Sequence, residues 1–322
     1  MKTCVVTGAG GFVGGAVARA LAARGDNVVG VVRSLRSGIS TGVPPVAVLA
    51  CGDVADARFM RELIARYEPD EVYHYAASSI VRQAVTDPLG AARANVMGTA
   101  ALLEACRGLA KRPRVLISSS DKVYGESEQP LPETAPLRPQ HVYDATKAAA
   151  DMIARAYCAD AGVDVVLTRS CNIFGPGDLN WSRLIPGACR ALVEFRCPTV
   201  FAGAMAREFV HVEDYVAAAL LVAEKGVVGS AYNVGTGDVL TPAMVVAQLF
   251  AVAAGNDERF KETLEKGELE KPSASGRPSG FGELSVQTVD ASRLRELGWS
   301  PAGSFDGGLY STYRWYLDYL RR

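Results

Sequence analysis

The sequence predicts an α/β protein built on a doubly wound parallel sheet. Apolar segments of strand length alternate with helical segments as far as about residue 170, which is typical of parallel strands joined by crossover helices. A glycine-rich turn follows the first apolar segment, and a tyrosine and a lysine four positions apart open a later helix. We expect residues 1–170 to form this sheet. Residues 171–322 are expected to form mainly a smaller α/β domain, with some segments returning to the sheet.

The composition limits the classes of partner. The 322-residue chain is 49% hydrophobic and carries 34 basic and 35 acidic residues, a formal net charge of -1. Without a basic face, we expect no nucleic-acid or membrane partner. Seven cysteines without a CxxC pair indicate reduced thiols and no metal site. The chain enters a strand directly after Met1, and no apolar run has the length of a membrane span, so we expect a cytoplasmic protein.

The first strand and its glycine turn predict a dinucleotide site. Residues 3–7 form a short apolar strand, and Gly8, Gly11 and Gly14 follow at three-residue spacing before a helix over residues 12–24. In such a turn the glycines allow a tight bend, a close approach to a pyrophosphate, and packing of the helix on the strand. The free amides and dipole of the helix N-terminus favour the anion. The predicted contacts here are Gly8, Gly11, Phe12, Val13 and Gly14.

The second strand, residues 27–32, ends without the acidic residue that would bind a ribose 2′-hydroxyl. It runs instead into Arg33, and a guanidinium at this place suits a 2′-phosphate. This favours NADP as cofactor, with NAD as the alternative if the loop is solvated and its arginines are incidental. The predicted contacts are Arg33, Ser34 and Arg36.

Further cofactor contacts are expected along the next elements. A third strand over residues 46–49 is followed by Asp53, near the expected adenine, and a fourth strand over residues 71–75 ends in small residues that permit close backbone approach. His74 lies within that strand and is interpreted as structural. A helix over about residues 89–108 carries Asn95. The predicted cofactor contacts are Asp53, Val54, Ala76, Ala77 and Asn95, and Ser78 is predicted to face the substrate.

Ser120, Tyr143 and Lys147 form the predicted catalytic group. Ser120 follows an apolar strand that includes residues 115–117, and the run of helix formers over residues 145–160 continues from Tyr143 and Lys147. Positions i and i+4 share a helix face, so the ammonium is expected to lower the pKa of the phenol and make it a general base. Ser120 would hold a substrate hydroxyl. The alternative is that this common spacing arose by chance, and the glycine turn argues against it.

The rest of the chain is more irregular. After a strand over residues 163–167, loops around 172–178 and 207–214 lie where the carboxyl edge of the sheet would hold a substrate. Residues 256–283 are strongly polar and are expected to form a mobile excursion. An amphipathic helix is predicted over about residues 307–320.

These motifs together resemble the extended short-chain dehydrogenase/reductase family of NAD(P)-dependent nucleotide-sugar epimerases and dehydratases. The resemblance implies a Rossmann domain with a smaller nucleotide-sugar-binding domain, and a homodimer built from two helices per subunit. It also implies that Ser120, Tyr143 and Lys147 are catalytic, and that Asn172, Arg207 and Arg277 contact the substrate diphosphate. The motifs that carry it are residues 7–14, 74–77, 95–99, 118–125, 143–147, 169–177 and 207–214.

Within this family, the pair after the catalytic serine distinguishes the reactions. Asp121 and Lys122 resemble the pair of CDP-glucose 4,6-dehydratases, and Arg33 resembles that of the NADP-dependent GDP-mannose 4,6-dehydratases. The resemblance implies that Asp121 protonates the leaving 6-hydroxyl and that a neutral Lys122 removes the C5 proton. A serine in place of the usual threonine at 120 departs from the dehydratases, as does the sequence that follows Arg207. A salt-bridged loop pair, a C4 epimerase and a 4-keto-6-deoxy-sugar reductase therefore stay open, and a non-catalytic dinucleotide sensor is disfavoured.

Overall fold

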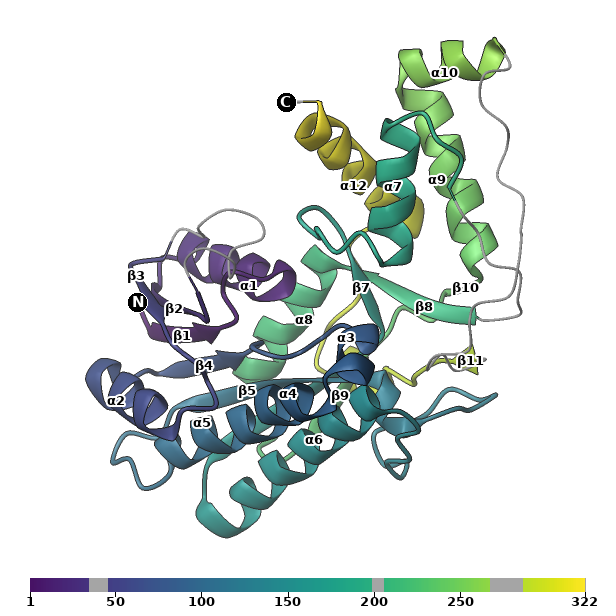
Figure 1. Ribbon diagram of the computed structural model, residues 1–322. Coiled ribbons are helices and arrows are strands. Elements are labelled where there is room, and N and C mark those ends of the chain that lie inside the picture. The colour runs from purple at the N-terminus through teal and green to yellow at the C-terminus, as the bar shows by residue number, and fades with distance from the viewer. Residues whose placement is uncertain (35–45, 199–205, 267–285, 322) are drawn as a thin grey trace.

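A seven-stranded parallel sheet forms the larger part of the structure, with strand order β3-β2-β1-β4-β5-β6-β9 (Figure 1). The computed structural model describes residues 1–34, 46–198, 206–266 and 286–321. This sheet confirms the predicted doubly wound α/β fold. Its strands are β1 (Thr3–Thr7), β2 (Asn27–Val32), β3 (Val48–Cys51), β4 (Glu71–His74), β5 (Arg114–Ser120), β6 (Asp164–Ser170) and β9 (Ala231–Val234).

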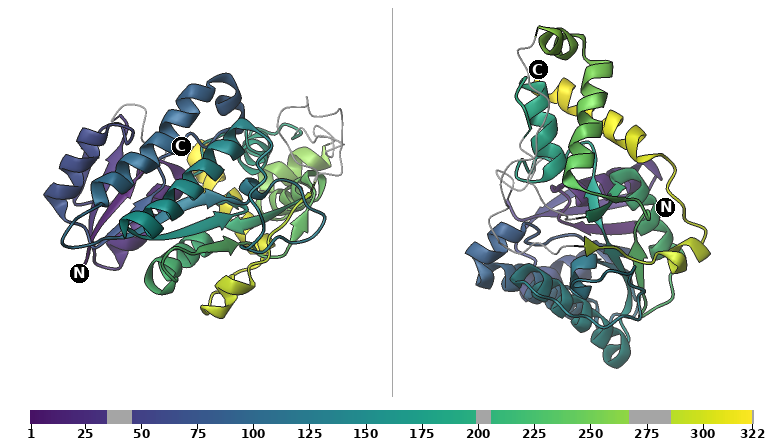
Figure 2. Two further views of the ribbon diagram at one scale, coloured as in Figure 1. Left: turned by 90° about the horizontal axis from the view of Figure 1, so that it is seen from below. Right: turned by 90° about the vertical axis from the view of Figure 1, so that its right-hand side faces the viewer.

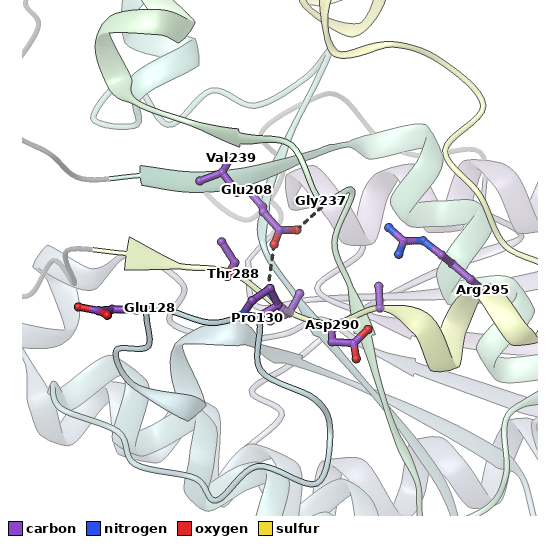
Figure 3. Close-up of a pocket in the computed structure, with 10 residues that line it drawn as sticks. Glu128, Pro130, Glu208, Gly237, Val239, Thr288, Asp290 and Arg295 are labelled. Carbon is purple, nitrogen blue, oxygen red and sulfur yellow. Dashed lines mark hydrogen bonds between the residues drawn. The ribbon is translucent and has the colours of Figure 1, made fainter.

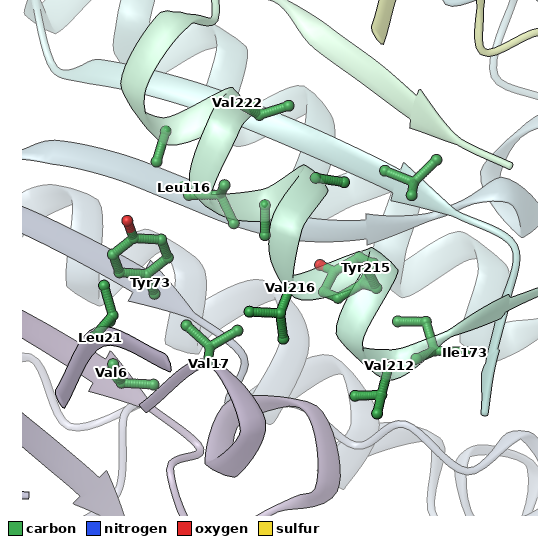
Figure 4. Close-up of a cluster of buried hydrophobic side chains, with 14 of the residues drawn as sticks. Val6, Val17, Leu21, Tyr73, Leu116, Ile173, Val212, Tyr215, Val216 and Val222 are labelled. Carbon is green, nitrogen blue, oxygen red and sulfur yellow. The ribbon is translucent and has the colours of Figure 1, made fainter. Parts of the chain in front are cut away.

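Helices cover both faces of this sheet, and each face has its own apolar core. The core shown in Figure 4 joins β1, β4 and β5 to two helices through side chains such as Val17, Tyr73 and Val216. The opposite core packs helices against Val115, Ile117 and their neighbours. The first face carries α1 (Phe12–Ala23) and α8 (Val212–Lys225), and the second carries α2 (Ala57–Tyr67), α5 (Gly98–Cys106) and α6 (Val142–Ala161).

The smaller part is a short sheet covered by helices, which gather at one end of the molecule above the large sheet (Figure 2, right). A third apolar core holds it together, around Phe209, Leu249 and Tyr313. The short sheet consists of β7 (Asn172–Phe174), β8 (Ala206–His211), β10 (Val239–Leu240) and β11 (Val286–Gln287). Its helices are α7 (Leu184–Val193), α9 (Pro242–Asn256), α10 (Glu258–Glu265) and α12 (Phe305–Leu320), and α11 (Ser292–Glu296) packs near β9.

Several elements differ in extent from their prediction. The third strand begins two residues later than expected, at Val48, and β5 and β6 both continue past the predicted apolar runs. The helix predicted over residues 89–108 is divided into α4 (Pro88–Ala92), a π-helical turn η1 (Arg93–Met97) and α5. A short α3 (Val81–Thr86) precedes it. Much of the predicted polar excursion, residues 267–283, lies outside the described residues.

No helix in the described ranges combines the length and apolar character needed to cross a membrane. Within the same residues, no three His, Cys, Asp or Glu side chains are grouped so that they could hold a metal ion.

A buried ion pair fastens α6 to the sheet. The Arg169 guanidinium on β6 donates two hydrogen bonds of 2.9 Å to the Asp151 carboxylate on α6, and both residues are at most 1% exposed. The same guanidinium donates to the Tyr124 hydroxyl at 2.8 Å, in the turn that follows β5. One pair therefore fixes the positions of α6, β6 and the end of β5 relative to one another.

We predict that Arg169→Met lowers the free energy of unfolding by about 3–5 kcal/mol, because it leaves Asp151 charged and buried without its bidentate partner. Urea denaturation measures this change. The matched control is Arg155→Met, which removes the other ion pair of Asp151 from a side chain that is 43% exposed, and it should cost less than about 1 kcal/mol. An Arg169→Met protein as stable as the control would contradict the account.

Candidate active site

The end of β5 brings a hydroxyl and a carboxyl together. Ser120 is the last residue of β5, and the 3-10 turn η2 (Asp121–Tyr124) begins immediately after it. The Ser120 hydroxyl donates to Asp121 Oδ1 at 2.9 Å and accepts from the Lys122 backbone N–H at 3.2 Å. Ser120 thus caps the turn and fixes the Asp121 side chain.

Tyr143 and Lys147 face this strand end from the first turns of α6, as the i, i+4 spacing predicted. Tyr143 is 8% exposed, and a hydrogen bond between its phenol and Ser120 lowers the phenol pKa in part. The Lys147 ammonium donates to the carbonyl oxygen of Ser118. The structure therefore brings together Ser120, Asp121, Tyr143 and Lys147, four of the five predicted catalytic residues.

The direction that we predicted for the pKa of Tyr143 is wrong. Burial, with the Asp121 carboxylate next in importance, raises the pKa of Tyr143 to about 12. Burial also lowers the pKa of Lys147 to about 8, against the opposing attraction of Asp151. The physical reason is that desolvation penalises both charged forms. The ammonium, moreover, is hydrogen-bonded to the strand backbone.

Asp121 is 4% exposed, and burial raises the pKa of its carboxyl above the ordinary value. The charge of Lys122, the Ser120 hydroxyl and the charge of Arg207 oppose that rise. A carboxyl in this setting holds its proton more readily than a surface aspartate does, which suits a general acid.

Lys122 is half-buried and lies near two buried carboxyls, Asp121 and Asp144, and its charge lowers the pKa of each. Burial is the larger effect and leaves the pKa of Asp144 raised. Asp144 follows Tyr143 directly and is 1% exposed, and within the part of the chain that the structure describes neither of its carboxylate oxygens has a well-formed hydrogen bond. We expected Lys122 to lie beside the charged Lys147; the neighbours that the structure shows are the carboxyls of Asp121 and Asp144.

The glycine turn forms a cradle that side chains cannot enter. Gly8 has a φ of +71°, and a Cβ there would lie 2.7 Å from the Ala76 backbone nitrogen. A Cβ on Gly14 would lie 2.3 Å from the Gly8 carbonyl oxygen. The N-terminus of α1 has no side-chain cap at Gly11. A backbone surface of this kind, beside a helix N-terminus without a side-chain cap, fits a dinucleotide pyrophosphate. Phe12 and Val13 open that helix, and Ala77 follows Ala76.

The residues predicted to surround the adenosine lie at the ends of β2 and β3. The Asp53 carboxylate pairs with Arg93 at 3.0 Å. Burial alone would raise the pKa of Asp53, but the Ala55 N–H, Arg93 and the charge of Arg33 lower it. Val54 is buried, Ser34 is half-buried and Arg33 is exposed. Arg36 lies outside the described residues.

The Asn95 side chain, predicted to contact cofactor, joins two protein segments. Its Oδ1 accepts from the Ser78 N–H at 2.7 Å, and its Nδ2 donates to the Ser78 carbonyl at 3.2 Å and to Thr146 Oγ1 at 2.8 Å. The π-helical turn η1 places the amide between these partners. Asn95 thereby fixes the loop after β4 against the helix that carries Tyr143.

The predicted substrate residues lie on β7 and β8. Arg207 faces the strand end, since its charge lowers the pKa of Asp121. Asn172 donates through Nδ2 to the Glu208 carbonyl at 3.2 Å. Arg277 lies outside the described residues.

Arg183 is a charged neighbour that we did not predict. It precedes α7, donates to Asp178 Oδ2 at 2.7 Å and to the Ile173 carbonyl at 2.8 Å, and its charge lowers the pKa of Tyr143 in part. Only its position before a helix distinguishes it in the sequence.

A cavity of about 520 Å³ is lined by Glu208 of β8 and Val239 of β10, among others, and none of the predicted catalytic residues line it (Figure 3). Glu208 points into it and accepts from the Val289 N–H at 2.9 Å and the Gly237 N–H at 3.2 Å. Because these bonds occupy its carboxylate, Glu208 links two loops to β8, and we do not assign the chemistry to this cavity.

His74 is buried between two threonine hydroxyls. Its Nδ1 lies 2.8 Å from Thr7 Oγ1, and its Nε2 lies 3.2 Å from Thr99 Oγ1. Burial, assisted by the charge of Lys147, lowers the pKa of His74 to about 3. The imidazole is therefore neutral and joins β1, β4 and α5, in agreement with the structural role predicted for it.

This buried imidazole predicts a loss of stability in mild acid. The pKa of His74 falls from 6.5 when unfolded to about 3 when folded. The unfolded chain therefore binds a proton that the folded protein excludes, and the free energy of unfolding decreases as the pH falls below about 6.5. Between pH 7 and pH 5 this amounts to about 2 kcal/mol. Urea denaturation at both pH values should show that His74→Gln loses this part of the decrease, and equal decreases in the two proteins would refute the assignment.

Comparison with known proteins agrees with this geometry. The model of the NAD dependent epimerase/dehydratase family matches residues 4–235. A dTDP-glucose 4,6-dehydratase of Xanthomonas campestris pv. campestris is 32% identical over 334 residues, covering 98% of this chain and 93% of that protein.

Solved structures of nucleotide-sugar epimerases and dehydratases are also similar to this chain. A UDP-glucose 4-epimerase of Thermotoga maritima with UDP-glucose has a TM-score of 0.88 and 26% identity, covering 99% of each chain. A double mutant of a dTDP-glucose 4,6-dehydratase of Streptomyces venezuelae with NAD has a TM-score of 0.81 and 29% identity, covering 98% of this chain and 97% of that one. The chain belongs to the NAD dependent epimerase/dehydratase family.

Proposed function

We propose that this protein is a nucleotide-sugar 4,6-dehydratase that acts through a 4-keto intermediate. The observation that carries the proposal is the buried Asp121 carboxyl, with its raised pKa, held by Ser120 at the end of β5. Elimination of water across C5 and C6 needs an acid for the leaving 6-hydroxyl, whereas inversion at C4 needs none. The 4,6-dehydratase relatives support the same choice.

In this proposal Tyr143 is the base that takes the proton of the sugar 4-hydroxyl, and Ser120 orients that hydroxyl. A nicotinamide cofactor supplies the acceptor and donor of the hydride when it is bound. For Tyr143 to form a phenolate, nearby positive charge must lower the pKa of its phenol by more than burial raises it. The charge of Arg183 favours the phenolate, and a proton on Asp121 removes the carboxylate that opposes ionisation. Lys147, one helical turn after Tyr143, is the proposed further positive group.

Lys122 is the proposed base for the C5 proton, which the 4-ketone acidifies. To act as a base, its ammonium must first release a proton. The buried carboxyl of Asp144, which lies near Lys122 and lacks a well-formed hydrogen bond, is a group of the chain that can accept one. Asp121 then protonates the 6-hydroxyl as it leaves as water.

Substrate and cofactor contacts follow from the same arrangement. Ser78 and Asn172 are proposed to contact the sugar nucleotide, and Arg207 and Arg277 its diphosphate. For the cofactor we propose NADP, because β2 ends in Arg33 and has no acidic residue for a ribose 2′-hydroxyl. Ser34 and Arg36 are the other proposed contacts to the phosphate, with Asp53 and Val54 near the adenine.

We predict that one member of a nucleotide-hexose panel loses one water without net reduction of cofactor, and does so faster with NADP⁺ than with NAD⁺. The panel is CDP-glucose, GDP-mannose, dTDP-glucose and UDP-glucose, with UDP-glucuronate as the member that lacks a leaving 6-hydroxyl, and mass spectrometry identifies the products. A new stereoisomer of unchanged mass would contradict the proposal and establish the epimerase, which the likeness to a UDP-glucose 4-epimerase keeps as the second candidate.

In the same assay, Asp121→Asn should reduce dehydration by about 10²–10⁴-fold, because the amide cannot donate the proton. Oxidation at C4, observed as a transient absorbance of reduced nicotinamide, should persist and serves as the internal control. Normal dehydration by this variant would remove Asp121 from its role.

We further propose a homodimer in a reducing, cytoplasmic environment. All seven cysteines are free thiols. The elements α4, η1 and α6 pack against one another, and each carries an exposed apolar side chain: Leu89 is 83%, Met97 57% and Met152 59% exposed. We propose that these side chains contribute to the interface. Light scattering should give twice the mass of one chain, and Met152→Glu should give a monomer. Val227→Glu, at a residue that is 60% exposed elsewhere, should remain dimeric, and a monomeric unmutated protein would contradict the proposal.

A further inference from the structure

Gln287 is a buried amide that is 2% exposed. Among the described residues, neither its Nε2 nor its Oε1 has a hydrogen-bond partner. An amide removed from water without partners costs free energy. A bound ligand that forms the missing hydrogen bonds would offset this cost.

The register of the short sheet places Gln287 next to Arg207. Strand β11 pairs in parallel with β8, with Gln287 opposite Arg207 and Val286 opposite Ala206. Residues in register on parallel strands direct their side chains to the same face, on strands about 4.8 Å apart. The side chain of Gln287 therefore lies on the same face of the short sheet as that of Arg207.

Alternation along the two strands identifies that face. The next residues along each strand, Glu208 and Thr288, line the cavity described above (Figure 3). Because side chains alternate along a strand, Gln287 and Arg207 both point away from that cavity.

We propose that Gln287 is a specificity residue, which hydrogen-bonds a neutral donor–acceptor group of the nucleoside next to the phosphates held by Arg207. This inference rests on the proposed function. A phosphate oxygen would use only the amide N–H groups and would leave the carbonyl oxygen facing an anion. A ribose hydroxyl or the amide edge of a base satisfies donor and acceptor together.

The test compares Gln287→Met with the unmutated protein in calorimetric titrations with UDP, dTDP, CDP and GDP. Methionine has a similar size and cannot form the two hydrogen bonds. We expect the nucleoside diphosphate to bind about five- to tenfold more weakly. The melting temperature without ligand should stay unchanged or rise by up to about 4 °C, since an unpaired amide is removed. A purely structural glutamine would instead give a lower melting temperature with unchanged affinity.

Comparing the nucleotides in the titration distinguishes a hydrogen bond to the base from one to the ribose. A loss confined to the preferred base assigns the amide to the base. A loss that is equal for all ribonucleotides and absent for their 2′-deoxy forms assigns it to the ribose. Thr288→Val, one residue along the strand on the opposite face, is the matched control and should leave the affinity unchanged.

The inference and the proposed function fail in different ways. If Gln287→Met binds every nucleoside diphosphate as tightly as the unmutated protein does, the role of Gln287 is overturned and the proposed function stands. If the unmutated protein binds none of the four, the proposed function fails, and the role of Gln287 fails with it.

Discussion

Burial of ionisable groups at the end of β5 is the constraint on which the site depends. Asp121, Tyr143 and Lys147 are all less than 10% exposed. At Tyr143 burial has a larger effect on the pKa than any neighbouring charge, and at Lys147 it outweighs Asp151. Burial therefore favours the neutral form of each of these three groups. A charged ligand that binds beside these groups will shift their pKa values strongly, because little water is present to screen its charge. Ligand binding therefore controls proton transfer at the end of β5.

The protonation states of Asp121 and Tyr143 are also coupled. An ionised Asp121 raises the pKa of Tyr143, and both groups contact the Ser120 hydroxyl. A proton on Asp121 thus favours loss of the proton from Tyr143. This repulsion disfavours ionisation of both groups at once. The state that the proposed dehydratase needs for its first step, acid protonated and phenol ionised, avoids it.

The surrounding structure keeps these groups in place through buried polar links. Arg169 and Asp151 fasten α6 to β6, and Asn95 fastens α6 to the loop after β4. Glu208 joins β8 to the two segments that carry Gly237 and Val289. These links connect segments distant in the chain, so the site is a property of the whole fold.

Local patterns in the sequence predicted what depends on local spacing. The glycine turn with Gly8 and Gly14, the shared helix face of Tyr143 and Lys147, and the strand end at Ser120 all follow from adjacent residues. The pKa values of buried side chains depend on the tertiary environment and could not be predicted in this way. The pKa of Tyr143 has the opposite direction because its burial comes from several elements at once.

The partners of side chains were equally hard to predict. Asn95 joins two protein segments because a π-helical turn redirects it, and Arg183 reaches the site from the residue before α7, which carries no motif. Arg36 and Arg277 lie outside the described residues, so their predicted contacts stay predictions.

The most direct test of the central claim follows one hydrogen atom. A nucleotide hexose accepted by the protein is labelled with deuterium at C4, and the product is analysed by mass spectrometry and NMR. The account predicts a product lighter by one water, with the deuterium at C6 and a ketone at C4. A product of unchanged mass that keeps the deuterium at C4 would contradict the dehydratase and leave an epimerase in its place.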